Sequence, residues 1–423
     1  MRRLPANAAL DVDLVVASSK TISAGRLALD RPGAIFEYAP GFDESGYQID
    51  PLSPPMPGPI AARAPRIFHG LHGVFADSLP DAWGEELVRR RCRRAGIEFA
   101  SLTALDRLAI VGHRGMGALA YRPAVPDESR EEIDFDALAT AATEILEGGE
   151  SDLLPELERL GGSSGGARPK VLVALDAAGH ARAGDDEIPD GYDGWLVKFR
   201  SSHDVRDIGP LEAAYATMAR SAGVDVPDHR LIPASTGAIG YFASKRFDRA
   251  PGGLRRHVVS VAGALNIDWT VPQIDYDTLL RLVRRVTRSQ SQVEEMLRRM
   301  IFNIVAHNRD DHAKQHAFVF DPARGWLLAP AYDLSFSFGP NGEHYLAVAG
   351  EARDVDAQAI RTIATSHDVN RKRLNGIVSD VLDAVHRFPG FANEFGVSRQ
   401  TRSDVQRGVR LGASRVDGLR KAI

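Results

Sequence analysis

The sequence predicts an α+β protein with a small β-rich N-terminal domain, residues 1–125, and a larger second domain, residues 126–423. Three observations lead to this prediction. The 423 residues are enough for two hydrophobic cores. Short apolar runs among Gly and Pro residues, such as 13–16 and 34–38, are typical of strands and mark the first part of the chain. The polar stretch 126–132 then precedes a helix-rich pattern and is the best candidate for a linker.

The composition is that of an ordinary soluble protein, with 44% hydrophobic and 26% charged residues. A formal net charge of −4 argues against a protein whose whole surface binds nucleic acid. The single cysteine, Cys92, excludes an intramolecular disulfide and a CxxC metal site, which suits a reducing cytosol. Because there is no apolar run of about 18 residues and no signal peptide, we expect a cytoplasmic protein that does not contact membranes.

Residues typical of helix ends and turns predict two helices and one turn. Gly84 to Arg94 read as a helix in the first domain, and Gly115 to Leu119 read as a turn that enters a strand. In the second domain, Ser291 and Glu294 form the pattern of a capping box at the start of a long helix. One face of that helix is apolar and is expected to pack in the core: Met296, Leu297, Met300, Ile301, Ile304 and Val305.

A glycine-rich loop, Gly161 to Lys170, leads directly into a buried strand, Val171 to Leu175. Glycine lets successive backbone N–H groups turn toward an anion, and Lys170 adds positive charge, so this loop is a candidate phosphate-binding loop. It lacks the G-x-x-x-x-G-K-[ST] pattern of a Walker A loop. A flexible Gly/Ser linker is the alternative, which the strand that follows at once disfavours.

Lys198 lies among apolar residues in Trp195 to Phe199, a segment that alternates as a strand does. A lysine in that setting is costly to bury unless it meets a negative partner. Glu212, near the start of a helical run that ends at Gly223, is a candidate partner. Two alternatives stay open: an edge-strand lysine that reaches solvent, and a Glu212 that only favours the first turn of its own helix.

The segment Asn308 to Gln315 repeats the spacing of the protein-kinase catalytic loop. In that loop an Asp base is followed five residues later by an Asn that binds magnesium, and Asp310 and Gln315 keep this five-residue step. The apolar runs on either side of the turn Asp321 to Gly325 predict a β-hairpin. Because a hairpin returns the chain on itself, we expect Asp310 and Asp333 to lie close together.

With these pieces in order, the chain resembles the HipA family of bacterial serine/threonine kinases, the toxins of toxin–antitoxin systems. The resemblance covers nearly the whole chain. It implies a protein-kinase-like second domain with a nucleotide lobe over about 150–255 and a mainly α-helical catalytic lobe over about 256–423. It rests on these segments: Gly33–Tyr38, Pro51–Ser53, Phe75–Asp81, Gly112–Leu119, Ser163–Lys170, Leu196–Lys198, Lys245–Arg249, Asp310–Lys314 and Ala329–Asp333.

Carried over position by position, the resemblance implies ATP and Mg²⁺ as cofactors, with Asp310 as the catalytic base and Asp333 as a magnesium ligand. Gln315 stands where the family has a metal-binding Asn, and its longer side chain ligates the ion only if the loop or the ion shifts. Ser163 matches the family's self-phosphorylated serine, and Ser164 is the rival acceptor. The residues implied in ATP binding are Gly165, Gly166, Ala167, Arg168, Pro169, Lys170, Lys198, Lys245, Arg246, Phe247, His312, Lys314 and Tyr332.

The resemblance further implies a toxin that phosphorylates a translation component, such as an aminoacyl-tRNA synthetase, and inactivates itself by autophosphorylation. The implied partner is a HipB-like helix-turn-helix antitoxin, so that contact with DNA is indirect. Three alternatives stay open. Gln315 favours a kinase-fold ATP-binding regulator with weak transfer activity, and no motif excludes a lipid or a small molecule as the acceptor. A metal-dependent hydrolase would use the set Asp310, Asp311, His312, His316 and Asp333.

Overall fold

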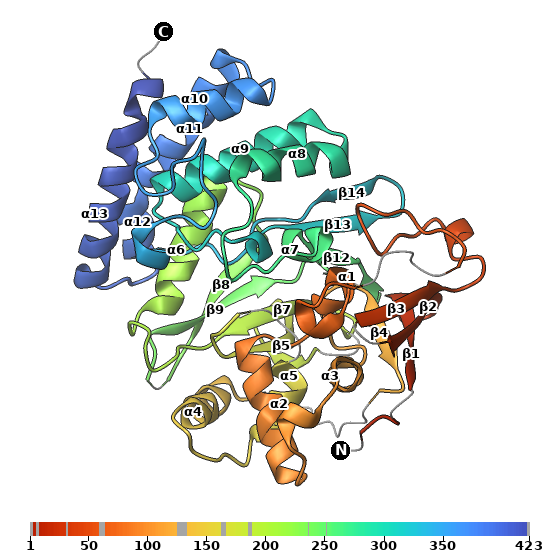
Figure 1. Cartoon of the computed structure of the whole chain (residues 1–423). Coiled ribbons are helices and arrows are strands. Elements are labelled where there is room, and N and C mark those ends of the chain that lie inside the picture. Colours follow the sequence, from red (N-terminus) through yellow and green to blue (C-terminus); the bar gives the residue numbers. More distant parts are fainter. Residues whose placement is uncertain are drawn as a thin grey trace.

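Figure 1 shows the computed structural model of the chain, with a helical lobe at the top, a five-stranded sheet below it and the N-terminal sheet at the right. The mixture of helices and sheets confirms the predicted α+β class. The predicted linker 126–132 lies outside the residues that the structure describes, as do Ser163, Ser164 and Gly165, and the domain boundaries stay predictions. The described residues are 3–5, 8–30, 33–58, 64–124, 133–161, 166–184, 188–235, 237–250 and 252–420.

The N-terminal sheet is antiparallel, with the strand order β3-β2-β1-β4. Its strands are β1 (Ala9–Ala17), β2 (Lys20–Asp30), β3 (Gly33–Tyr38) and β4 (Leu119–Arg122). The strands β1 and β3 contain the two apolar runs predicted as strands, and the predicted turn leads into β4. The helices of this region are α1 (Gly73–Ala76), α2 (Ala82–Arg94) and α3 (Ala104–Val111). The helix α2 confirms the predicted helix but begins at Ala82 rather than Gly84.

The second sheet is also antiparallel and has the order β6-β5-β7-β9-β8. Its strands are β5 (Lys170–Asp176), β6 (Ala181–Ala183), β7 (Tyr192–Lys198), β8 (His229–Pro233) and β9 (Gly240–Lys245). The helices α4 (Phe135–Leu146) and α5 (Leu154–Gly161) precede it, and α6 (Ile208–Ser221) connects β7 to β8. This arrangement makes β7 the central strand.

The helical lobe follows two short pieces of sheet. The strands β10 (Arg249–Ala250) and β11 (Leu254–Arg255) pair with each other, and a three-stranded sheet is formed by β12 (Val258–Ser260), β13 (Ala317–Asp321) and β14 (Gly325–Leu328). The helices are α7 (Val261–Leu265), α8 (Tyr276–Thr287), α9 (Gln290–Val305), α10 (Ala357–Ser366), α11 (Arg371–His386), α12 (Phe388–Glu394) and α13 (Arg399–Val416). The predicted hairpin is confirmed by the pairing of β13 with β14.

The start of α9 differs from the prediction. The helix has Ser289 at its N-cap, and no side chain caps it. The hydroxyl of Ser291 shares a hydrogen bond with that of Ser289 (2.9 Å), and Glu294 pairs with Arg373 of α11 (2.8 Å). The predicted capping box is therefore wrong, because a neighbouring helix takes the carboxylate. The apolar face is confirmed as buried core: Met296, Leu297, Met300, Ile301, Ile304 and Val305.

The N-terminal region shares its hydrophobic core with both parts of the second domain. One cluster of buried side chains joins the first sheet to α9 and α11, and another joins α2 to α4, α5 and the second sheet. Where α1 meets α7, a Cβ on Gly73 would lie 2.1 Å from the carbonyl oxygen of Gly263, so this approach requires glycine. The N-terminal region is therefore packed against the rest of the protein at several places.

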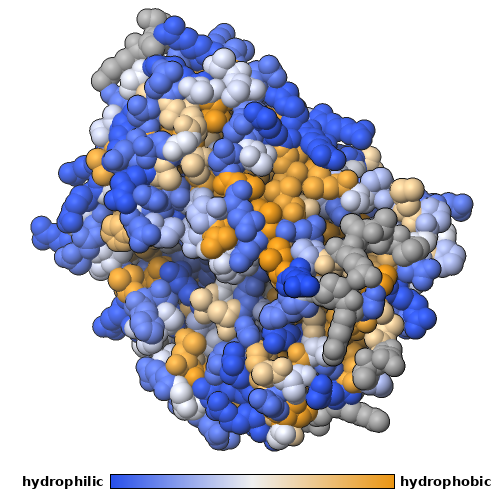
Figure 2. All heavy atoms as spheres, viewed as in Figure 1, coloured by the Kyte–Doolittle hydropathy of each residue, from blue (hydrophilic) through white to orange (hydrophobic). Residues whose placement is uncertain are grey.

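Hydrophilic residues cover most of the face shown in Figure 2, and hydrophobic residues gather right of its centre, below the helical lobe. Other exposed apolar side chains are scattered, such as Leu29 on β2, Leu146 on α4 and Leu411 on α13, which is usual for protein surfaces. Among the described residues, no helix combines the length and the apolar character that crossing a bilayer requires.

Candidate active site

The predicted catalytic loop follows α9 and is anchored by buried polar contacts. Asn308 donates from Nδ2 to Asn303 Oδ1 (2.9 Å), and Asp311 accepts from Tyr276 Oη (2.8 Å). Asp311 is fully buried, whereas the side chain of Asp310 is 49% exposed. Asp311 therefore maintains the shape of the loop, and the carboxylate of Asp310 is accessible from the solvent.

Asp333 returns to this loop after the hairpin. Its φ of +56° is a left-handed backbone conformation that is uncommon outside glycine and frequent at functional sites. One carboxylate oxygen accepts from Lys198 Nζ, and the other accepts from Gln315 Nε2 at 2.9 Å. Burial raises the pKa of Asp310, to which nearby Asp333 also contributes. The side chain of Gln315 contacts both Asp310 and Asp333, which confirms that these two residues lie close together.

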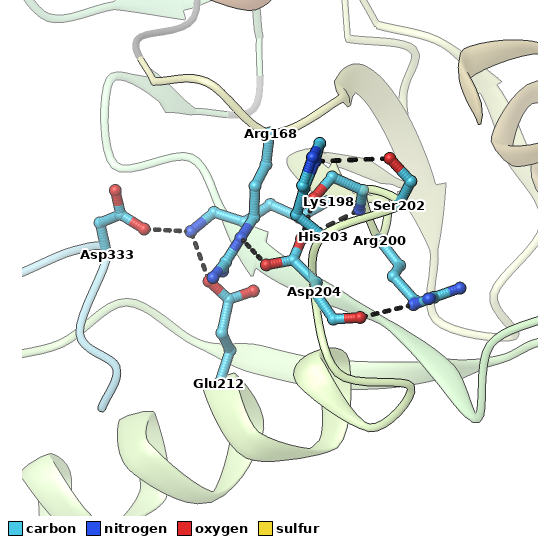
Figure 3. A network of polar contacts seen from close by, with 9 residues as sticks. Arg168, Lys198, Arg200, Ser202, His203, Asp204, Glu212 and Asp333 are labelled. Atoms are coloured by element: carbon cyan, nitrogen blue, oxygen red, sulfur yellow. Dashed lines mark hydrogen bonds and ion pairs between the residues drawn. The ribbon is translucent and has the colours of Figure 1, made fainter. Parts of the chain in front are cut away.

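Lys198 ends the central strand β7, so the alternative of an edge-strand lysine is wrong. Its side chain is buried, and Nζ donates to Glu212 Oε1 (2.9 Å) and to Asp333 (Figure 3). Burial alone would lower the pKa of Lys198, but the Asp333 and Glu212 carboxylates raise it above its ordinary value. The predicted contact with Glu212 is confirmed, and it is made from the first half of α6.

Arg168 brings the glycine-rich loop into the same network. It donates from Nη1 to Glu212 Oε1 (2.9 Å) and from Nε to Asp204 Oδ1 (3.1 Å), as Figure 3 shows. Asp204 also accepts from the backbone N–H (2.9 Å) and the hydroxyl (2.7 Å) of Ser201. The sequence does not single out Asp204, because nothing in the polar loop after β7 marks it as the partner of a residue 36 positions earlier.

Lys170 lies directly opposite Lys198 in the register of β5 and β7. Their exposed fractions are only 3% and 9%. Like charges directly opposite each other destabilise a sheet, so this pair needs negative charge nearby. Burial, followed by the repulsion from Lys198, lowers the pKa of Lys170 to about 8, although Asp333 and other carboxylates act in the opposite direction. The paired strands thus place two buried lysines side by side, next to the carboxylates of Glu212 and Asp333.

Asp81 reaches the site from the N-terminal domain. Its carboxylate accepts from the backbone N–H of Gly166 (2.8 Å) and from Lys314 Nζ (2.5 Å). Gly166 has a φ of +101°, which a residue with a Cβ resists. Sequence reasoning missed Asp81, because the segment that contains it is a feature of the N-terminal domain and its partner Lys314 lies 233 positions away.

Gln315 presents its amide nitrogen, not its oxygen, to Asp333. Magnesium prefers oxygen ligands, so an ion between these two side chains requires the amide to turn by half a rotation. After that turn, an amide oxygen and a carboxylate oxygen face the same point. The oxygen ligands present therefore fit a magnesium ion, which Asp333 and Gln315 would hold if phosphate oxygens supplied its other ligands.

Aromatic rings fix the rest of the catalytic loop. Trp269 packs on His312 with 4.6 Å between ring centroids, and its ring centroid lies 5.7 Å from Lys314 Nζ. Tyr345 meets His312 edge-on at 5.3 Å. Burial lowers the pKa of His312, although the adjacent Asp310 acts in the opposite direction. These contacts hold His312 between two rings beside the exposed carboxylate of Asp310.

The residues predicted to line the adenine lie on the connector after β9 or near it. Lys245 pairs with Asp193 (2.8 Å), and Phe247 stacks on Tyr332 with 6.0 Å between ring centroids. Tyr332 Oη donates to the carbonyl oxygen of Lys314 (2.8 Å), which links this stack to the catalytic loop. Phe247 and Tyr332 are thus placed together, and their role toward a nucleotide stays a prediction.

Arg246 is directed to the N-terminal domain. It is buried and donates to Asp248 at 2.9 and 2.7 Å, and Asp248 also accepts from the backbone N–H of Gly117 (2.8 Å). The guanidinium therefore holds the connector against the turn before β4. The remaining loop residues, Ala167 and Pro169, lie between Gly166 and Lys170, and Pro169 accepts a backbone hydrogen bond from Phe199 (2.8 Å).

The residues of the hydrolase alternative do not form one cluster. Asp311 is turned inward and pairs with His344 (2.9 Å), and His316 is buried. In the part of the chain that the structure describes, no three His, Cys, Asp or Glu side chains are arranged to hold a metal ion. The geometry therefore offers no support for a hydrolase that depends on these side chains alone.

Two family models match the chain. The HipA N-terminal domain matches residues 15–122, and the HipA-like C-terminal domain matches residues 162–388, which include the whole network around Lys198. These matches cover both predicted domains and more than half of the chain.

The chain is also similar in sequence to two proteins named as putative kinases, and it is similar in fold to one solved HipA structure. In Sinorhizobium fredii, "Putative kinase Y4dM" is 30% identical over 154 residues, 33% of this chain and 36% of that protein. "Putative kinase Y4mE" from the same organism is 27% identical over 406 residues, 86% of this chain and 89% of that protein. The HipA structure from the Shewanella oneidensis MR-1 complex of HipA, HipB and operator DNA has a TM-score of 0.68 at 19% identity. That match covers 98% of this chain and 100% of the other, and it shows that the fold is shared.

Proposed function

Because the chain belongs to the HipA family of kinases, we propose that it is an ATP- and Mg²⁺-dependent serine/threonine protein kinase. The observation that carries the proposal is the contact of buried Lys198 with both Glu212 and Asp333, directly beside Lys170. Two buried lysines at the end of paired strands suit an anionic ligand. The exposed carboxylate of Asp310 nearby suits an acceptor hydroxyl.

Phosphoryl transfer depends on positioning and on neutralising charge more than on covalent chemistry. In the proposed reaction, Lys198 and Lys170 bind phosphate oxygens from the sheet, and Lys314 binds them from the catalytic loop. Glu212 orients Lys198 for this task. A magnesium ion held by Asp333, and by Gln315 after its amide turns, would supply further neutralisation of phosphate charge.

Asp310 accepts the proton of the attacking hydroxyl in this proposal. Its side chain is half exposed, and burial of its surroundings raises its pKa above the ordinary value of an aspartate. A carboxylate with a raised pKa holds a transferred proton better and is the stronger base. His312, packed between Trp269 and Tyr345, borders the space in front of Asp310.

We extend the proposal to regulation at Ser163, with Ser164 as the rival acceptor. The support is the family resemblance and the place of these serines just before Gly166, whose N–H faces the site. A phosphate there adds about −1.5 to −2 charges, which would repel the phosphates of ATP and hold the loop out. Mass spectrometry after incubation with ATP tests this, and phosphate on neither serine would remove the switch from the proposal.

For the acceptor protein we propose a translation component, such as an aminoacyl-tRNA synthetase. For the partner we propose a helix-turn-helix antitoxin, because the solved relative with the same fold is a complex of HipA with HipB and operator DNA. Contact with DNA would then be made through the antitoxin. Copurification of the chain with the product of a neighbouring gene would test this partner.

The proposed activity is tested by incubating the protein with labelled ATP and Mg²⁺, alone and with a cell lysate. We expect label on the protein itself and on a lysate protein. Asp310→Asn should reduce both by about 10² or more, the scale of a lost general base. Asp404→Asn removes a surface carboxylate of α13 and should change neither. Absence of label in every reaction of the parent protein would overturn the proposal.

A second candidate function is favoured by one residue. Gln315 stands where the family has a metal-binding Asn, and its side chain is longer by one methylene group, whereas magnesium tolerates little deviation from octahedral ligation. This favours a kinase-fold protein that binds ATP and transfers phosphate slowly. Calorimetry separates the two candidates: tight binding of Mg-ATP by a chain that transfers no phosphate would favour the regulator.

A further inference from the structure

Asp81 occupies the N-cap position of α2, where an aspartate normally accepts from the backbone N–H groups of its own first turn. Here its side chain makes no capping hydrogen bond. The carboxylate turns away from α2 to the second domain. The helix therefore forgoes a local stabilising contact, which indicates that the carboxylate is engaged more strongly elsewhere.

The two groups that Asp81 binds are both of a kind that binds phosphate. One is the N–H of Gly166, at a left-handed position of the glycine-rich loop, and the other is Nζ of Lys314 in the catalytic loop. The side chains of Asp81 and Lys314 are only 13% and 17% exposed. At such sites the attraction between opposite charges is less screened than at an open surface. Asp81, which belongs to the N-terminal domain, therefore links the glycine-rich loop of one lobe to the catalytic loop of the other.

The segment that carries Asp81 is fixed on the helical lobe. Asp77 accepts from the backbone N–H (2.6 Å) and the hydroxyl (2.7 Å) of Ser260, and the N–H of Gly73 donates to Asn266 Oδ1 (2.7 Å). These contacts leave the segment little freedom. Asp81 at its end is thus held at a defined place between the two loops.

Lys198 and Lys314 are each held by a carboxylate from outside their own loop or strand. Glu212 holds Lys198 from α6 at 2.9 Å, and Asp81 holds Lys314 from the N-terminal domain at 2.5 Å. An ammonium group has three donors, so a lysine held by one carboxylate keeps donors for a phosphate. We propose that Asp81 is a positioning residue, which orients Lys314 and the Gly166 end of the glycine-rich loop toward the phosphates of the bound nucleotide. The inference rests on the proposed kinase function and gives the N-terminal domain a part in the reaction.

The test is a double-mutant cycle that combines Asp81→Asn with Lys314→Met. Asparagine keeps the shape of aspartate and can still accept from Gly166, but it lacks the charge that holds Lys314. We expect Asp81→Asn to lower kcat by about tenfold or more, since a misplaced phosphate-binding group is costly. Mg-ATP affinity should fall by a smaller factor. In the Lys314→Met background, Asp81→Asn should lower neither quantity further, because two residues that act as a unit are not additive.

A purely structural role of Asp81 predicts other results. If Asp81 only braces the domains, Asp81→Asn lowers kcat by the same factor, or the melting temperature by the same amount, in the parent and in the Lys314→Met background. That result would overturn the proposal. Faster turnover or tighter ATP binding by Asp81→Asn would also overturn it, because Asp81 would then compete with phosphate for Lys314. The control is Asp13→Asn, which removes a buried carboxylate of the same domain that binds Arg122 (2.6 Å). We expect that variant to keep the parent's kcat and ATP affinity.

The binding measurements separate this inference from the proposed function. If the parent binds Mg-ATP but transfers no phosphate, the kinase proposal fails, and calorimetry on the same four proteins still tests Asp81. In that case, weaker Mg-ATP binding by Asp81→Asn only when Lys314 is present supports the positioning role. An equal change in both backgrounds, or no change in either, overturns it.

Discussion

Two lysines of the candidate site are held by carboxylates, but the partners come from very different places in the sequence. Lys198 and Glu212 are 14 positions apart, within one lobe, whereas Lys314 and Asp81 are 233 positions apart, in different domains. The first pair follows from a strand and the helix after it. The second exists only because the N-terminal domain packs against both lobes. The comparison teaches that this site is completed by a domain that carries no kinase motif.

The two halves of the site also differ in their exposure and chemistry. The sheet side offers buried cations, with Lys170 and Lys198 opposite each other at 3% and 9% exposure. The loop side offers Asp310, whose side chain is 49% exposed. We therefore expect changes on the sheet side to affect nucleotide binding and turnover together, and changes on the loop side to affect mainly the chemical step.

The largest effect is expected for Lys198→Met. This change removes a charge that both Glu212 and Asp333 help to place, so transfer should fall by about 10²–10³, the scale of a lost preorganised charge. ATP affinity should fall as well. Lys372→Met, at an exposed position of α11, is the control and should keep both. A Lys198→Met protein that is folded and fully active would contradict the assignment of the sheet side.

The loop side should show its character in the pH dependence. Burial, with a contribution from Asp333, raises the pKa of Asp310, so its carboxylate takes up a proton at a higher pH than an ordinary aspartate does. A protonated base cannot accept the hydroxyl proton. We therefore expect kcat/KM to fall about tenfold per unit as the pH drops through that raised pKa. This fall at low pH should be missing from the pH profile of the residual activity of Asp310→Asn. A fall that persists in that variant belongs to another titrating group.

A smaller effect is expected for Gln315→Asn. The side chain of glutamine is longer by one C–C bond, about 1.5 Å, and its nitrogen now binds Asp333. Because magnesium tolerates little deviation from octahedral ligation, the shorter asparagine should raise turnover and lower the magnesium concentration at half-maximal rate, by a few-fold. Manganese should rescue part of the parent's rate. A variant that is no faster and needs as much magnesium as the parent would show that Gln315 does not limit the enzyme.

Sequence reasoning succeeded where neighbours along the chain decide the outcome. The hairpin that returns Asp333 to the loop follows from two apolar runs and a turn, and the Lys198–Glu212 contact follows from a strand and the next helix. It failed where the tertiary structure selects the partner. Glu294 pairs with Arg373 of α11 instead of capping α9, and Asp81 binds Lys314 instead of capping α2. In both cases a carboxylate with a suitable local role pairs instead with a cation that is distant in the sequence.

The smallest expected effect concerns protons taken up with the nucleotide on the sheet side. Burial and the neighbouring Lys198 lower the pKa of Lys170 to about 8, so at pH 8 about half of the free protein carries a neutral Lys170. ATP phosphates favour the charged form and raise this pKa. Binding at pH 8 should therefore be accompanied by uptake of up to about half a proton, measured by calorimetry in buffers of different ionisation enthalpy. Toward pH 6 the uptake by this group should vanish, because Lys170 is then already charged.

The matched control for this prediction is Lys170→Arg. Arginine keeps the positive charge at every accessible pH, so it can bind phosphate without taking up a proton. The variant should bind ATP at pH 8 with the uptake abolished, while the parent and Lys372→Met show it. Equal uptake by the parent and Lys170→Arg would place the proton on another group. The sheet side would then bind the nucleotide with both lysines already charged, and its contrast with the exposed base of the loop would hold without any uptake of protons.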